Sequence, residues 1–88
     1  MAVRISFRGE IYQEARLYVA ICPELDVSSF GETPREAEDS LREAVSAFLD
    51  ECEALGSLTE VLEEAGFAKR GDAWVSRTPV LAKSLTTE

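Results

Sequence analysis

The residue types that could support catalysis cluster between Cys22 and Glu32 of this 88-residue chain. Cys22 offers a thiol, and Ser28 and Ser29 offer hydroxyl groups. The chain contains no histidine, so the Ser–His and Cys–His pairs that activate such nucleophiles are excluded. The serines also lack the glycine-flanked turn of a hydrolase nucleophile. We therefore predict that the chain has no catalytic residue and is not an enzyme.

Three carboxylates in the same stretch, Glu24, Asp26 and Glu32, offer a different chemistry. Carboxylate oxygens are ligands of Mg²⁺, and Glu24 and Asp26 would point to the same side of a regular strand. Two observations argue against a metal site. The first strand carries no acid before Glu10 that could add a ligand, and no basic residue lies nearby in the sequence to hold a phosphate. We predict solvated surface residues, no metal site and no cofactor, with a magnesium-dependent nuclease as an alternative.

Composition and charge narrow the class of partner. The net charge is −8 with a pI near 4.5, which argues against a nucleic-acid partner and fits a partner with a basic face. No run approaches the ~20 apolar residues of a membrane helix, and the N-terminus lacks the apolar core of a signal peptide. We expect a cytoplasmic protein with no membrane contact, in which Cys22 and Cys52 are small buried hydrophobic residues without a disulfide.

The first half of the chain predicts three strands. Val3–Phe7 alternates apolar and polar residues, and Ile11 extends the pattern. Residues 13–16 form a polar connection. Leu17–Cys22 is a continuous apolar run, typical of a central strand buried on both faces. Leu25–Phe30 alternates again and predicts the third strand.

A capped helix follows Gly31. Thr33 is suited to the N-cap, Pro34 to the first helical position, and Glu36 to a capping box that reaches back to the cap. Apolar residues recur at steps of three and four up to Gly56, which is expected to end the helix in a left-handed conformation. Eight acids and two bases lie on this segment: Glu32, Glu36, Glu38, Asp39, Glu43, Asp50, Glu51 and Glu53, with Arg35 and Arg42. They indicate either a surface for a basic partner or a solvated face.

The second half predicts smaller elements. Ser57 and Glu60 repeat the capping-box spacing before a short helix that ends at Gly66. Gly71 marks a hairpin or tight turn, and we interpret the Arg–Gly–Asp tripeptide as residues that suit this turn. Trp74 either fixes this hairpin to the core or anchors a partner. Residues 80–85 predict a last strand at a sheet edge.

Together these elements predict one α+β domain over residues 1–88, in the order β-β-β-α-α-β, with a core over 1–56 and a C-terminal extension over 57–88. An antiparallel sheet of three to four strands carries one main helix on one face. The other face must meet solvent or a second copy. Because the apolar run over residues 17–22 favours burial of both faces of its strand, we expect a homodimer or higher oligomer. Alternatively, the second helix and the tail fold over the second face.

The segment Leu17–Glu51 resembles the HicB-like antitoxin family. The family pattern is an apolar strand, a Pro-Glu-Leu turn, a short strand, Gly-Asp/Glu-Thr and a helix rich in Glu-Ala. Its elements in this sequence are Pro23, Glu24, Leu25, Gly31, Glu32, Thr33, Glu36, Ala37, Glu43 and Ala44. The resemblance covers about a third of the chain, and its variant has Pro-Glu-Leu-Asp-Val at the turn.

The resemblance implies a truncated RNase H-like fold and an antitoxin function. Proteins of this family neutralise a small basic mRNA-cleaving toxin of the HicA-like kind, whose active site uses a histidine. Many also carry a DNA-binding C-terminal domain, but the pattern after Gly56 leaves no room for one, so we expect a single-domain variant. In this hypothesis Glu24, Asp26 and Glu32 contact the toxin. The alternative is an orphan homo-oligomeric module without a toxin.

Overall fold

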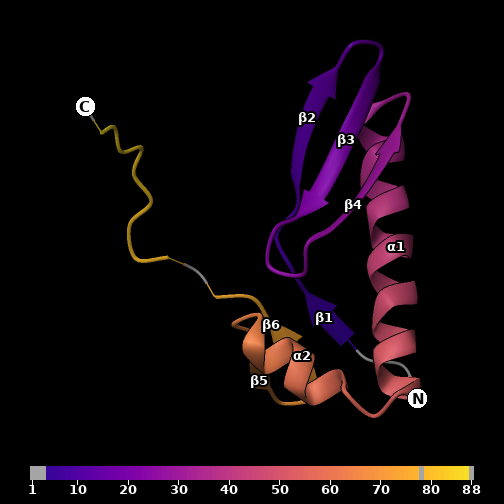
Figure 1. The fold of residues 1–88 in the computed structure, drawn as a ribbon, viewed down its shortest axis with the longest axis vertical. Helices are drawn as coiled ribbons and strands as arrows, with labels where there is room; N and C mark the ends of the chain where they lie inside the picture. Colours follow the sequence, from indigo (N-terminus) through magenta and orange to yellow (C-terminus); the bar gives the residue numbers. More distant parts are fainter. Residues whose placement is uncertain (1–3, 78, 88) are drawn as a thin grey trace.

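The computed structural model describes residues 4–77 and 79–87 of the chain. It is an α+β structure in which two small sheets are connected by a long helix (Figure 1). In chain order the elements are β1 (Arg4–Ser6), β2 (Glu10–Glu14), β3 (Leu17–Cys22), β4 (Val27–Gly31), α1 (Pro34–Ala54), α2 (Leu58–Glu64), β5 (Ala68–Arg70) and β6 (Ala73–Val75).

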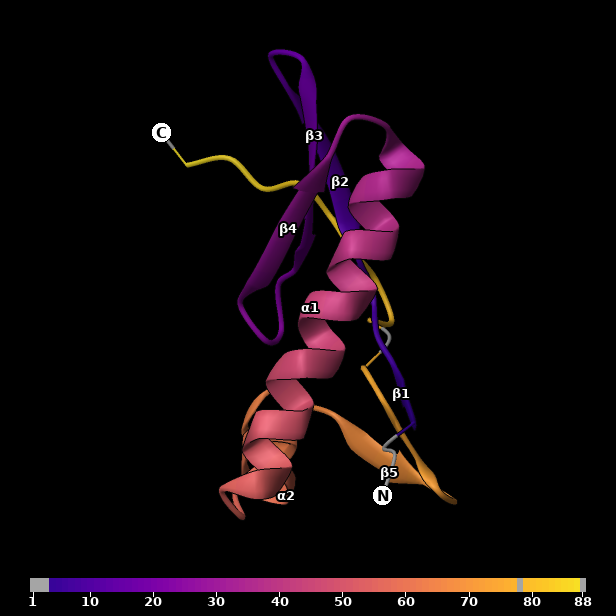
Figure 2. The same ribbon diagram turned by 90° about the vertical axis from the view of Figure 1, so that its right-hand side faces the viewer.

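The main sheet is the predicted antiparallel meander β2-β3-β4. Glu10 pairs with Ile21 and Glu14 with Leu17 across the first hairpin, and Tyr18 pairs with Gly31 across the second. Helix α1 lies along one face of this sheet, mainly against β3 and β4 (Figure 2). The two-layer α+β architecture is thus confirmed.

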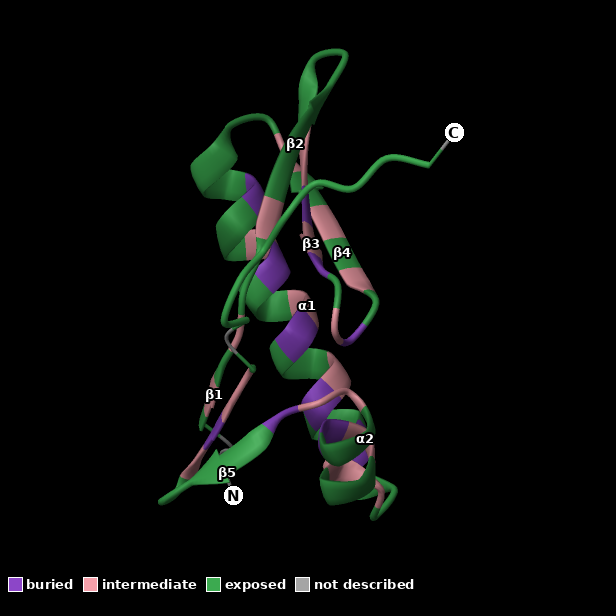
Figure 3. Cartoon of the chain, turned by 90° about the vertical axis from the view of Figure 1, so that its left-hand side faces the viewer, coloured by how far each residue is buried: buried purple, intermediate pink, exposed green. Residues whose placement is uncertain are grey.

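The core lies between this sheet and the helix. Ala37, Leu41, Val45, Leu49 and Cys52 are the buried residues of α1, and their spacing places them on one stripe of the helix. Figure 3 shows the buried part of α1 as a purple stripe along the helix. The stripe packs with Ala20 and Cys22 of β3, both fully buried, and each large side chain buried this way stabilises the fold by roughly 1.5–3 kcal/mol.

The apolar strand β3 is buried on one face only, so the prediction of burial on both faces is wrong for the single chain. Ala20 and Cys22 face α1, whereas Val19 and Ile21 alternate to the other side and are only half-buried. Leu17 retains 40% of its exposure. No described element of the chain covers that side.

The N-terminal segment forms two strands rather than one. β1 pairs in parallel with β6, and β2 pairs with β3, so consecutive strands belong to different sheets. Gly9 lies between them, where an added Cβ would come within 3.2 Å of Leu41 Cδ2. The predicted polar connection over residues 13–16 is also too long, because Gln13 and Glu14 end β2 and the turn consists of Ala15, with a φ of 55°, and Arg16.

The turn between β3 and β4 shortens the predicted third strand. The Asp26 N–H donates to the Pro23 carbonyl at 3.3 Å, and Asp26 has a φ of 55°. β4 therefore begins at Val27 instead of Leu25. Leu25 still turns inward and joins the core.

The ends of the helices follow the predicted capping in part. Thr33 Oγ1 accepts from the Glu36 N–H at 3.0 Å, as expected, but Glu36 Oε1 accepts from the N–H of Glu32 rather than from that of the cap. Gly56 ends α1 with a φ of 75°. The second capping box does not form, because Ser57 Oγ donates to the Cys52 carbonyl at 3.4 Å instead of capping α2.

The C-terminal part begins with the predicted hairpin, β5-β6, which turns at Gly71 with a φ of 63°. Trp74 is buried in the core, which confirms its interpretation as a hairpin anchor, and residues 70–72 lie exposed in the turn. The strand predicted over residues 80–85 is absent from the described structure. Residues 79–87, here called the C-terminal arm, run as an exposed extended segment (Figure 1). No helix within the described residues could span a bilayer.

Candidate protein-binding site

The three predicted contact residues lie at two ends of one strand. Glu24 and Asp26 belong to the turn before β4, and Glu32 follows its last residue. The five residues of β4 separate the two positions by about 17 Å at ~3.3 Å per residue. Within the described residues, no three Cys, Asp or Glu side chains converge to hold a metal ion. The structure therefore does not unite these acids in one site.

Glu24 is directed into the molecule. Its side chain is only 17% exposed, and Oε2 lies 3.9 Å from Arg8 Nη2. Oε1 is buried without a hydrogen-bond partner among the described atoms. Asp26 is exposed, but its left-handed backbone makes it a turn residue. These two acids are therefore less suited to contact a partner than the sequence indicated.

Glu32 lies beside a hollow at the corner where β4 passes into α1. We call this the corner hollow. It has a volume of about 410 Å³ and is lined by Leu17, Phe30, Gly31, Glu32, Glu36, Asp39 and Ser40. Three acids from the start of the helix thus meet two exposed apolar side chains from the sheet.

Local sequence explains why the corner has this shape. Gly31 has no side chain, and a Cβ there would lie 2.5 Å from the Ala37 nitrogen, so β4 passes directly against the first turn of α1. The Thr33 cap starts the helix at once. The Glu32 N–H donates to Glu36 Oε1 at 3.3 Å, which holds the backbone of Glu32 against the helix.

The electrostatics of the corner hollow leave one carboxylate free. Asp39 is engaged by Arg42 at 2.9 Å and lies 4.0 Å from Arg35. The side chain of Glu32 makes no hydrogen bond or ion pair within the described part of the chain. A Lys or Arg side chain entering the hollow would find this carboxylate at one end. It would also find the ring of Phe30, which is 63% exposed, as a surface for its stem or guanidinium.

The apolar half of this site was not predicted from the sequence. Phe30 directly follows Ser29, which shares the helix side of the sheet with Ala20 by register, so strand alternation alone turns Phe30 outward. The signal available in the sequence was an aromatic residue at a strand position that alternation places on the solvent-exposed face. Leu17 gave no such signal, because it begins an apolar run that predicts burial.

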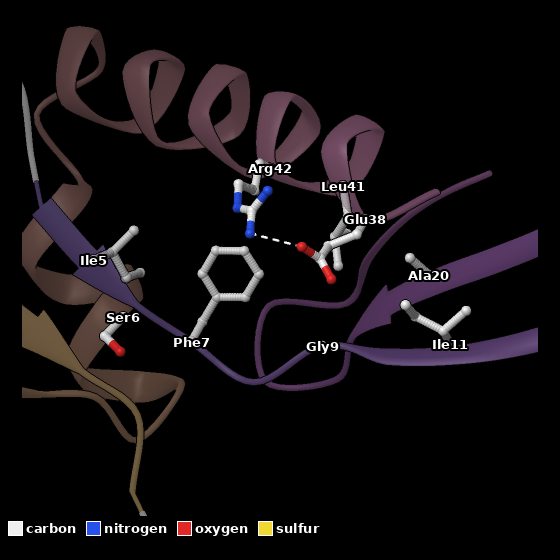
Figure 4. A pocket seen from close by; sticks show the side chains of 9 residues that line it. All are labelled: Ile5, Ser6, Phe7, Gly9, Ile11, Ala20, Glu38, Leu41 and Arg42. Atoms are coloured by element: carbon white, nitrogen blue, oxygen red, sulfur yellow. Dashed lines mark hydrogen bonds and ion pairs between the residues drawn. The ribbon is translucent and has the colours of Figure 1, made fainter. Parts of the chain in front are cut away.

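A second hollow lies on the β2 side of α1 (Figure 4). Its volume is about 380 Å³, and Phe7, Ile11 and Leu41 are among its lining residues. Its two charged residues neutralise each other, because Arg42 Nη2 lies 2.7 Å from Glu38 Oε2. This hollow therefore presents no unpaired charge for recognition or catalysis.

The nucleophile candidates are structural residues. Cys22 is fully buried, and burial raises the pKa of its thiol, with the Glu24 carboxylate adding a smaller effect in the same direction. Both cysteines are free and buried, as predicted. Ser28 and Ser29 point to opposite faces of β4 and thus form no paired site.

Comparison with known proteins found no matching family model, no matching curated protein and no matching solved structure. The resemblance of residues 17–51 to HicB-like antitoxins therefore stays a prediction. The corner hollow and the surface charge must carry the functional argument.

Proposed function

We propose that this chain is a cytoplasmic, HicB-like protein-interaction domain that binds and masks a small basic mRNA-cleaving toxin. The observation that carries the proposal is the corner hollow, in which an unpaired carboxylate stands beside an exposed aromatic ring. This combination is suited to an Arg or Lys side chain of a partner. The sequence pattern of residues 17–51 supports the toxin as the kind of partner.

The charge of the molecule favours the same kind of partner. A net charge of −8 on 88 residues attracts a basic protein over a range of about 8–10 Å at physiological salt. On α1, Glu43 and Asp50 are exposed and form no ion pair with described residues. They extend the acidic surface along the helix, away from the corner hollow.

Masking follows from the chemistry of the partner. A protein that cleaves RNA must present Lys and Arg side chains to phosphate groups. Carboxylates that pair with those side chains compete with RNA for the same surface. We therefore expect Glu32 to pair with a basic residue of the RNA-binding surface of the toxin, with Phe30 packed against the same side chain.

The test starts from the tagged chain as bait in a lysate of the source organism. We expect capture of a small basic protein that contains a histidine. That protein alone should arrest bacterial growth, and co-expression of this chain should relieve the arrest. The purified pair is then titrated by calorimetry with wild-type chain, Glu32→Lys and Phe30→Ala.

The expected losses follow from the type of contact. Removing one partner of an interfacial charge pair costs about 2–5 kcal/mol, so Glu32→Lys should weaken binding by at least tenfold. Glu64→Lys makes the same charge change at an exposed position at the end of α2 and should leave affinity within about threefold, as expected for a surface charge. Equal affinities of the two variants would contradict the site, and failure to capture a growth-arresting protein would contradict the function.

One observation favours the alternative of a homo-oligomeric module. The sheet face opposite α1 is apolar and uncovered in the single chain. A self-association site there would share Leu17 and Phe30 with the corner hollow, but not Glu32.

A further inference from the structure

The face of the main sheet that points away from α1 is largely apolar. Residues directly opposite one another in the ladder share a face, and the register aligns Tyr12 with Val19 and Val19 with Phe30 in one row. Leu17 and Ile21 flank this row on β3. Tyr12 and Phe30 remain 51% and 63% exposed. We call these five side chains the open face.

The C-terminal arm carries a second set of exposed apolar side chains. Val80, Leu81 and Leu85 are 106%, 76% and 83% exposed, so their own domain covers almost none of them. In Figure 1 the arm leaves the domain on the side of the sheet opposite α1 and then runs upward at a distance from the sheet. Its apolar residues are thus left without cover by the described domain.

The charges of the two surfaces are complementary. The C-terminal arm carries one charged residue, Lys83, in a chain with a net charge of −8. On β2, Glu10 and Glu14 share the side of Tyr12 because strand residues alternate, so two carboxylates border the open face. The charge of Lys83 therefore favours contact of the arm with this acid-bordered face.

The sizes of the two surfaces also agree. Nine extended residues, 79–87, reach up to about 30 Å, whereas the six residues of β3 span about 20 Å. The arm can therefore cover the full length of the open face. Tyr12 and Phe30 retain 51% and 63% of their exposure, and the three apolar side chains of the arm retain 76% or more, so contact between the two sets would bury apolar surface on both partners.

We propose that the open face is a homodimer interface occupied by the C-terminal arm of a second copy, with the two arms exchanged about a two-fold axis. The arm stands apart from its own sheet in Figure 1, which favours a second copy over its own chain. Reciprocal exchange covers both apolar surfaces in each copy and closes the assembly at two chains. This inference does not depend on the proposed toxin.

The test measures the mass of the full chain in solution by sedimentation equilibrium. The wild-type chain of 9.7 kDa should form a dimer. Leu85→Asp in the arm and Tyr12→Lys on the open face should each weaken dimerisation by at least tenfold. The matched control is Leu55→Asp, because Leu55 is 75% exposed at the end of α1, close to the value for Leu85, and lies outside both surfaces. Circular dichroism verifies that every variant is folded.

Mixing two variants identifies whose arm occupies the face. Tyr12→Lys keeps a working arm, and Leu85→Asp keeps a working open face, so exchange predicts a heterodimer in the mixture at concentrations where each variant alone is monomeric. A monomeric wild-type chain, a dimer that resists Leu85→Asp, or a mixture without heterodimer would each overturn the proposal. Glu32→Lys should leave the dimer intact, which separates this test from that of the corner hollow.

Discussion

Replacement of Gly31 by alanine tests whether close contact between β4 and α1 shapes the domain. A Cβ at this position would lie 2.5 Å from the Ala37 nitrogen and 2.7 Å from both the carbonyl carbon and the Cβ of Glu36. Most of these atoms belong to the backbone of the first helical turn, which cannot rotate aside. The strand and the helix must therefore separate by several tenths of an ångström or more to reach ordinary van der Waals contact.

The expected cost can be bounded from related substitutions. Overpacking a well-packed site costs about 1–3 kcal/mol, and the loss of glycine freedom in the unfolded chain returns about 0.4–1 kcal/mol. A net loss of about 1–2 kcal/mol is therefore expected, out of a total of roughly 4–13 kcal/mol for a domain of this length. At about 4–8 °C per kcal/mol, the melting temperature should fall by roughly 5–15 °C.

The assay is urea denaturation followed by the fluorescence of Trp74 and by circular dichroism, at one protein concentration for all variants. Gly9→Ala is the comparison variant, because its nearest contact, the end of the Leu41 side chain at 3.2 Å, requires a shift of only a few tenths of an ångström. It should change the free energy of unfolding by less than about 0.5 kcal/mol, as for an ordinary surface substitution. If Gly31→Ala is as stable as Gly9→Ala, the packing argument for the corner fails.

Two further predictions concern a cap and a buried thiol. Thr33→Ala should cost about 0.5–2 kcal/mol of unfolding free energy because it removes the N-cap hydrogen bond, whereas Ser57→Ala should cost clearly less because Ser57 makes no such bond; equal losses in urea denaturation would contradict the capping assignments. Burial raises the pKa of the Cys22 thiol, so the unfolded chain loses this proton first. The protonated thiol therefore contributes its full share to the free energy of unfolding below the unfolded thiol pKa of about 8.5, and this contribution is lost as the pH rises above that value. Denaturation from pH 7 to 10 should show this decline in the wild-type chain and a smaller one in Cys22→Ala; parallel declines would refute it.

Local features of the sequence predicted most of the elements. The meander and α1 follow from alternation, from the helical apolar stripe and from Thr33 at the cap, because each depends on residues close together in the chain. Gly56 and Gly71 adopt the expected positive φ values. The errors at Ser57 and at residues 80–85 share a cause: a local pattern permits a cap or a strand, but a competing acceptor or a missing neighbour decides whether it forms.

The candidate site, like the fold, was predicted from the sequence only in part. Glu32 was predicted from the sequence, and its place at the corner follows from the strand–helix junction. Glu24 was predicted with it, but the pairing of β3 with β4 directs Glu24 inward toward Arg8, at the far end of the strand. Glu24 and Glu32 are the ends of a nine-residue segment. This short spacing in the sequence could not show that the two side chains lie far apart, because most of the segment is an extended strand.

By itself, the sequence determined the acidic charge, the exclusion of histidine chemistry, and the order of the strands and helices between residues 10 and 66. These are properties of composition and of short-range spacing. Only the tertiary structure decided that β1 leaves the main sheet to pair in parallel with β6, that Phe30 and Leu17 join three acids in one hollow, and that one face of β3 stays uncovered. Each of these depends on which distant segments meet, and that is set by packing and long-range hydrogen bonds rather than by local preference.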